Sequence, residues 1–148
     1  MFRYICLTAC RILRLFVLAD KSVVESKERV RAALSSLGLS LPPKRIAVNL
    51  APADLAKEGS HYDLPIALGL LIAIGAIPSD SVDHMIVMGE LALDGGITGV
   101  NGILAAALSV ASEGKGMICP ETNGAEAAWS GDIKIIAAPS LMALINHL

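Results

Sequence analysis

The chain has 148 residues, of which 54% are hydrophobic, 18% charged and 3% aromatic, and its formal net charge is −2. A chain of this length is expected to form one domain that buries roughly 68–70% of its unfolded surface, around a core of Ala, Leu, Ile and Val. The slightly acidic charge argues against direct binding of nucleic acid by this chain alone. Because no uninterrupted apolar run of membrane-spanning length occurs, we expect no membrane contact.

The residues that commonly hold metals or nucleotides are not grouped in the sequence. Cys6, Cys10 and Cys119 show no CxxC spacing, and the three histidines show no HxxxH spacing, so we predict no metal site. The thiols are expected to be reduced, which fits a cytoplasmic location. There is no GxxxxGK[ST] motif, so the sequence predicts no bound cofactor in this chain.

The first elements in chain order are an irregular segment, a helix and a strand. In residues 1–17, Arg11 and Arg14 interrupt the apolar run, which is atypical of a signal peptide. The apolar spacing of residues 21–37 predicts an amphipathic helix that Gly38 ends. Alternating apolar residues then predict a strand over residues 46–50.

The most distinctive stretch is a long apolar segment that follows this strand and a polar loop. Residues 64–77 are apolar all round, which predicts a buried helix. Asp63 is expected to cap its first turn, where Pro65 is tolerated because the missing N–H costs nothing there. A strand, a polar loop and a buried helix that meet at one point are a natural place for a site.

The rest of the chain alternates short strands and helices. The sequence predicts strand 85–90, a hairpin 91–100 turning at Asp94–Gly95, helix 102–112 capped by Asn101 and closed by Gly114, strand 116–119 stopped by Pro120, helix 123–129, strand 133–137, and a last helix to residue 148 capped by Ser140. This mixture, with at least one hairpin, favours an α+β domain built as a two-layer α/β sandwich over a purely parallel wound sheet.

Three segments together resemble a known family. Residues 25–34 (ESKERVRAAL), 42–69 (PPKRIAVNLAPADLAKEGSHYDLPIALG) and 89–108 (GELALDGGITGVNGILAAAL) resemble the N-terminal domain of Mg-chelatase-like AAA+ ATPases of the ComM/YifB type. The resemblance covers residues 18–148. It implies a Lon proteolytic-domain-like scaffold with a ribosomal protein S5 domain 2-like fold. It also implies a following ATPase module and a role in DNA branch migration during natural transformation.

The sequence departs from the family pattern at both ends. The element FVLAD lacks the glycine usual in the family, and residues 1–17 do not look like its opening strands, so we expect a degenerate N-terminal segment. The AAA+ module lies outside this chain, which suggests a truncated gene product or a fragment. ATP and Mg are therefore expected only for that module. Expected partners are such a module or further copies of the chain, with DNA contacted only through the full assembly.

Proteases of the Lon type use a serine and a lysine, the lysine taking the serine proton. The resemblance places Asp63 at the serine position and Leu104 at the lysine position, so we predict a capping residue and a core residue in place of the dyad. Ser60 and Lys57 are the nearby substitutes, and a Ser60–His61–Asp63 triad is a weaker one. The leading hypothesis is thus a non-catalytic accessory domain, with a Ser60 peptidase and a DNA-contacting module as alternatives.

Overall fold

The computed structural model describes residues 21–41 and 60–148. Its first helix, α1 (Lys21–Ser36), confirms the predicted amphipathic helix. Val30, Ala33 and Leu34 are buried on its inner face. Gly38 follows with a φ of +73°, the left-handed conformation that ends a helix. The predicted strand at residues 46–50 lies outside the described residues.

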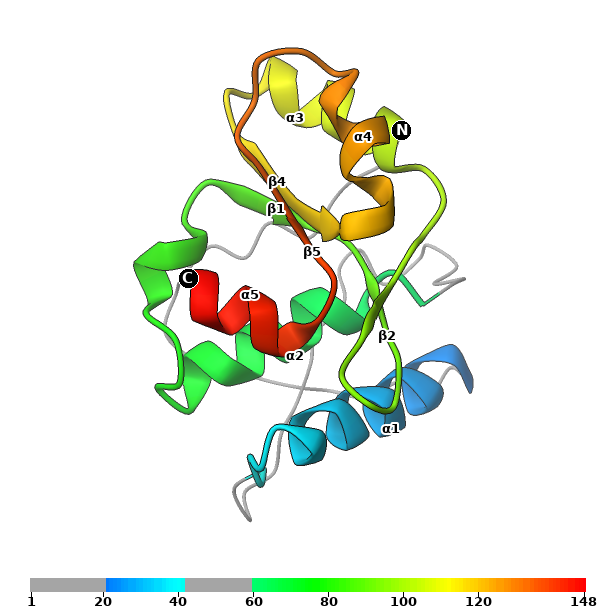
Figure 1. Ribbon diagram of the computed structural model, residues 1–148, viewed down its shortest axis with the longest axis vertical. Coiled ribbons are helices and arrows are strands. Elements are labelled where there is room, and N and C mark those ends of the chain that lie inside the picture. The colour runs from blue at the N-terminus through cyan, green and yellow to red at the C-terminus, as the bar shows by residue number, and fades with distance from the viewer. Residues whose placement is uncertain (1–20, 42–59) are drawn as a thin grey trace.

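In the described part of the chain, three parallel strands form the central sheet (Figure 1). They are β1 (Met85–Val87), β4 (Gly116–Pro120) and β5 (Ile135–Ala138), in the order β1-β4-β5. All five residues of β4 are buried, as expected for a strand covered on both faces. The predicted strand 85–90 is wrong in its second half. The chain leaves the sheet at Gly89, whose N–H donates to the His61 carbonyl instead of to a strand.

A separate hairpin follows, confirming the turn predicted at Asp94–Gly95. Its strands are β2 (Glu90–Leu91) and β3 (Ile97–Thr98), which pair antiparallel. Gly95 has a φ of +90°, and the Ser36 hydroxyl donates to the Asp94 carbonyl at 3.0 Å. The hairpin tip is therefore tied to the end of α1.

Helices cover both faces of the parallel sheet. On one face lie α2 (Asp63–Ala73) and α5 (Leu141–His147), and on the other lie α3 (Ile103–Ser112) and α4 (Gly124–Ala128) (Figure 1). The short 3-10 helices η1 (Ser79–Val82) and η2 (Glu121–Asn123) complete the described elements. The predicted mixture of helices and strands is confirmed, and the described elements are consistent with an α/β fold. The doubly covered parallel sheet differs from the two-layer arrangement, because side chains on both faces of β4 are apolar and each face needs a covering layer.

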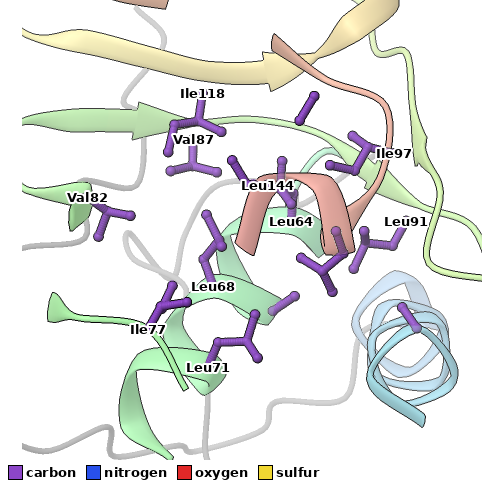
Figure 2. Close-up of a cluster of buried hydrophobic side chains, with 14 of the residues drawn as sticks. Leu64, Leu68, Leu71, Ile77, Val82, Val87, Leu91, Ile97, Ile118 and Leu144 are labelled. Atoms are coloured by element: carbon purple, nitrogen blue, oxygen red, sulfur yellow. The ribbon is translucent and has the colours of Figure 1, made fainter. Parts of the chain in front are cut away.

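The core is divided by the sheet into two clusters. The larger cluster joins α1, α2, α5, the hairpin and one sheet face, and Figure 2 shows its members Leu64, Leu68, Leu71, Ile77, Val82, Val87, Leu91, Ile97, Ile118 and Leu144. The smaller cluster lies under α3 and α4 and contains Ile86, Met88, Ile103, Ala106, Ala107, Val110, Met117, Cys119 and Ala127. Burial raises the pKa of the Cys119 thiol to about 11, so this cysteine is an inert core side chain.

Helix boundaries depart from prediction at two places and agree at a third. The buried helix ends at Ala73, earlier than predicted, because Gly75 takes a φ of +75° and closes it. Asn101 does not cap α3, whose N-cap is Gly102. Ser140 does cap α5, since its hydroxyl accepts from the Ala143 N–H at 3.2 Å.

Within residues 21–41 and 60–148, no helix has the length and hydropathy needed to cross a membrane. In the same ranges, no three His, Cys, Asp or Glu side chains gather in a way that could hold a metal ion.

Candidate functional site at the start of the buried helix

The start of α2 is joined directly to the backbone that follows β1. The Leu64 N–H donates to the Gly89 carbonyl at 3.0 Å, and the Gly89 N–H donates to the His61 carbonyl at 3.1 Å. A β-carbon on Gly89 would lie 3.0 Å from a Leu64 methyl and 3.2 Å from an Ile97 methyl. The absence of a side chain at Gly89 therefore allows the helix to start at the carboxyl edge of the sheet.

Asp63 is the central polar residue of this region, and it is fully buried. Its carboxylate accepts from the Ser26 hydroxyl at 2.5 Å, from Arg29 Nε at 2.6 Å and Nη2 at 3.2 Å, and from the Leu91 N–H at 3.2 Å. These partners come from α1 and β2. We call Ser26, Arg29 and Asp63, with the Leu91 N–H, the acidic junction.

The prediction that Asp63 caps its own helix is wrong. The N-cap of α2 is Tyr62, whose side chain makes no capping hydrogen bond. Capping would point the carboxylate at the first-turn N–H groups, whereas here it points toward α1 and the hairpin. The physical reason is that a buried carboxylate needs a cation, and Arg29 of α1 supplies one.

The acidic junction is a paired buried charge and not a poised catalytic acid. Arg29 keeps 21% of its side chain exposed, while the Asp63 side chain is inaccessible. The hydrogen bond to Asp63 raises the pKa of the Arg29 guanidinium, so Arg29 stays protonated at every physiological pH. With four donors on its two oxygens, the Asp63 carboxylate has no accessible lone pair for a substrate.

The first turn of α2 also lacks donors for an oxyanion. Its backbone N–H groups are already used or are missing: Asp63 donates to the Ser60 carbonyl, Leu64 to Gly89, Ile66 to Tyr62, and Pro65 has none. Stabilising a tetrahedral intermediate requires free donors aimed at the developing charge. Among the described residues, these first-turn N–H groups are therefore not free to bind an oxyanion.

Ser60 lies beside the helix start, half-buried, and its hydroxyl donates to a Glu90 carboxylate oxygen. Lys57, its predicted partner, lies outside the described residues. Within the described residues, the hydrogen-bond partner of the Ser60 side chain is thus a carboxylate from β2.

The Ser60–His61–Asp63 triad does not form, because Ser60 bonds to Glu90 and Asp63 bonds to α1 and β2. The His61 ring instead packs against Tyr62, with ring centroids 4.0 Å apart. Desolvation lowers the pKa of His61 below its ordinary value, and the charge of Asp63 acts in the opposite direction.

The second predicted position, Leu104, is in a different network. Leu104 is half-buried and belongs to neither core cluster, so its prediction as a core residue is wrong. Its backbone N–H donates to Glu126 Oε1 at 3.2 Å, and Glu126 Oε2 accepts from Asn123 Nδ2 at 2.9 Å. Asp63 is bonded to α1 and β2, whereas Leu104 is bonded to α4. The two positions therefore lie on opposite faces of the sheet.

Sequence reasoning missed Ser26, Arg29 and Glu126. The sequence patterns that could have identified them are weak. Ser26 is a polar residue on the inner face of an amphipathic helix, and Arg29 follows three residues later on the same side. Glu126 lies in a helix too short to show a pattern. Their partners are far away in sequence, 37 residues from Ser26 to Asp63 and 22 from Leu104 to Glu126.

A hollow of about 330 Å³ lies at the opposite, amino edge of the sheet. Its polar lining includes Asp83, His84, Lys115, Asp132 and Lys134. These side chains mix both charges and contain no residue of the acidic junction. The hollow is thus separate from the helix start where the family resemblance places chemistry.

The fold and this region define an α/β domain whose buried helix starts from a charged structural junction. The chain belongs to the Mg-chelatase subunit ChlI family, because the profile described as "Subunit ChlI of Mg-chelatase" matches residues 8–123.

Individual relatives agree with this family and are much longer than the chain. The chain is 38% identical to competence protein ComM of Haemophilus influenzae over 131 residues, which are 88% of this chain and 26% of that protein. It is 37% identical to YifB of Escherichia coli over 131 residues, with the same coverage of 88% and 26%. It is 41% identical to YifB of Salmonella typhimurium over 109 residues, 74% of this chain and 22% of that protein. The chain thus spans about a quarter of the length of the curated relatives it matches.

Proposed function

We propose that this chain is a non-catalytic, Lon-like accessory domain with a ribosomal protein S5 domain 2-like scaffold, which serves the assembly or regulation of an AAA+ ring that processes DNA. The ring itself is formed by the ATPase module of the family, in the same polypeptide or from another copy, and acts in the cytoplasm. ATP and Mg belong to that module. DNA is contacted through the assembled ring.

The observation that carries the proposal is the acidic junction. In the family resemblance the Lon-type nucleophile belongs at the position of Asp63, and here that carboxylate is buried and bonded to α1 and β2. The neighbouring N–H groups are also bonded within the protein. A position used in this way supports a scaffold that packs and positions, and argues against one that cleaves. The name of the Haemophilus relative, a competence protein, supports the link to DNA processing.

A chimera tests the accessory role. The matched quarter of Haemophilus ComM is deleted in one variant and replaced by this chain in another. We expect deletion to impair ring assembly and ATP hydrolysis, measured by light scattering and phosphate release, and we expect the replacement to restore them. Unchanged assembly and hydrolysis in the deletion variant would contradict the proposal.

A peptidase that uses Ser60 is the second candidate, favoured by one observation, the hydrogen bond from the Ser60 hydroxyl to the Glu90 carboxylate. A carboxylate that accepts a hydrogen bond from a serine hydroxyl can act as its general base. A fluorophosphonate probe decides between the two functions. We expect no labelling of the chain; labelling that disappears in Ser60→Ala and persists in Ser81→Ala, an exposed-hydroxyl control, would establish a nucleophile and overturn the accessory-domain proposal.

Direct DNA binding is tested by titration with branched and single-stranded DNA. We expect no binding by the isolated chain, because its net charge is −2. Binding that weakens steeply with added salt would show phosphate contacts and would favour the DNA-contacting module.

A further inference from the structure

Two Asn-Gly dipeptides, Asn101–Gly102 and Asn123–Gly124, lie beside each other at the carboxyl edge of the sheet. They are neighbours because the Asn123 side chain bonds to both backbone polar groups of Val100. A glycine after an asparagine leaves the following backbone nitrogen free of steric hindrance, so it can reach the carboxamide carbon. The two dipeptides have this chemistry in common and differ in how the fold holds them.

Asn123–Gly124 is held by four hydrogen bonds. Asn123 Oδ1 accepts from the Val100 N–H at 3.0 Å, and Nδ2 donates to the Val100 carbonyl at 3.1 Å and to Glu126 Oε2 at 2.9 Å. The Gly124 N–H donates to the Glu121 carbonyl. The carboxamide is therefore fixed in orientation, and the attacking nitrogen is engaged in a helical turn.

Asn101–Gly102 has none of these restraints. Both residues are exposed, and Gly102 has a φ of +85° in the turn that leads into α3. Among the residues that the structure describes, neither the Asn101 carboxamide nor the Gly102 N–H makes a hydrogen bond. The nitrogen and the carboxamide are thus open to water and free to approach each other.

We propose that Asn101 is a site of spontaneous deamidation in the folded protein and that Asn123 is protected. The Gly102 nitrogen gives up its proton to a base in solution and attacks Asn101 Cγ. The new N–Cγ bond forms a succinimide, the Cγ–Nδ2 bond breaks, and ammonia leaves with the proton. Water then opens the ring at one of its two carbonyls, giving aspartate or isoaspartate. No oxidation or reduction occurs.

The two products differ in their effect on α3. Aspartate adds a negative charge just before the positive end of the helix, which is a favourable position. Isoaspartate instead adds one carbon to the backbone of the turn that contains Gly102. The modification therefore alters the approach to α3 without entering either core cluster.

The test is to incubate the whole folded chain at mildly alkaline pH and to follow both asparagines by peptide mass spectrometry. We expect Asn101 to deamidate at least about tenfold faster than Asn123, since two or more lost hydrogen bonds are needed to free the second site. In urea, where the fold no longer restrains Asn123, the two rates should come close together. Equal rates in the folded chain, or a faster rate at Asn123, would overturn the proposal.

Two variants separate the causes. Asn101→Gln, which disfavours the five-membered ring, should abolish isoaspartate in the peptide that contains position 101, as detected by isoaspartyl methyltransferase labelling. Isoaspartate that persists there at the parent level would contradict the assignment. Glu126→Ala, which removes one partner of Asn123, should raise the rate at Asn123 and leave Asn101 unchanged. An unchanged rate at Asn123 would show that hydrogen bonding is not what protects it.

Discussion

The starts of α2 and α3 are held in two different ways, although both lie at the carboxyl edge of the sheet. Neither helix has a capping side chain on its own N-cap residue. The start of α2 is bonded to α1 and β2 through the side chain of Asp63, which is fully buried and paired with Arg29. The start of α3 is bonded to α4 through the half-buried side chain of Glu126, which accepts from the Leu104 N–H and from the neutral amide of Asn123. Because a buried charge has lost its hydration, the acidic junction should depend much more on each partner than the Glu126 network does.

The largest expected effect comes from removing the buried charge. Asp63→Asn leaves Arg29 without its partner and disturbs the bonds to Ser26 and the Leu91 N–H, so we expect the free energy of unfolding to fall by about 3 kcal/mol. Urea denaturation measures this change. The control is Glu25→Gln, since the Glu25 carboxylate is exposed and 3.9 Å from Arg29; it should change stability by less than about 0.5 kcal/mol. Equal stabilities of the two variants would show that the buried Asp63 carboxylate contributes no more than the exposed Glu25 carboxylate.

A smaller effect is expected from the neutral member of the acidic junction. Ser26→Ala removes a buried hydroxyl that donates to Asp63 at 2.5 Å, and a hydrogen bond to a charged group contributes about 2 kcal/mol. The same urea experiment applies. Ser35→Ala, an exposed position on the same helix, is the matched control and should stay within about 0.5 kcal/mol of the parent. A loss as large as that of Asp63→Asn would mean that packing, and not charge, dominates.

The start of α3 should be more tolerant. Glu126→Ala removes the acceptor of the Leu104 N–H and one partner of Asn123, which we expect to cost about 1 kcal/mol. Thermal unfolding followed by circular dichroism measures the change. Glu121→Ala, an exposed glutamate on the preceding turn, controls for the lost negative charge. A cost above that of Asp63→Asn would reverse the order of the two networks.

The smallest effect is a pH dependence at the α2 start. Burial lowers the pKa of His61 in the folded chain, so the unfolded chain binds a proton first as the pH falls. The contribution of His61 to the free energy of unfolding is complete above about pH 6.5, the ordinary pKa of histidine. This contribution declines as the pH falls below that value. Unfolding midpoints in urea at several pH values should show this decline, and His61→Gln should reduce it. The exposed His84→Gln variant should retain it; equal slopes for both variants would exclude His61 as the cause.

Much of the local structure was predictable because it depends on neighbours in sequence. The apolar spacing predicted α1, Asp94–Gly95 predicted the hairpin turn, and Ser140 predicted the start of α5. Each of these signals acts within one turn or one hairpin. The family was also evident from the sequence, since long segments with specific residues carry that information.

The roles of polar residues at the two helix starts were not predictable in the same way. Asp63 has the sequence context of a helix cap, but in the structure it is the carboxylate at the centre of the acidic junction. Asn101 has the same context and is an exposed turn residue. A capping preference is worth only about 1 kcal/mol, which the pairing of a buried carboxylate readily exceeds.

The sequence by itself therefore determined the elements, the apolar faces and the family of this protein. Only the tertiary structure decided that Asp63 faces Arg29, that Glu126 holds the start of α3, and that helices cover both faces of the parallel sheet. The physical reason is that local preferences act over a few residues, whereas a buried charge or an apolar sheet face must find its partner wherever the chain brings one.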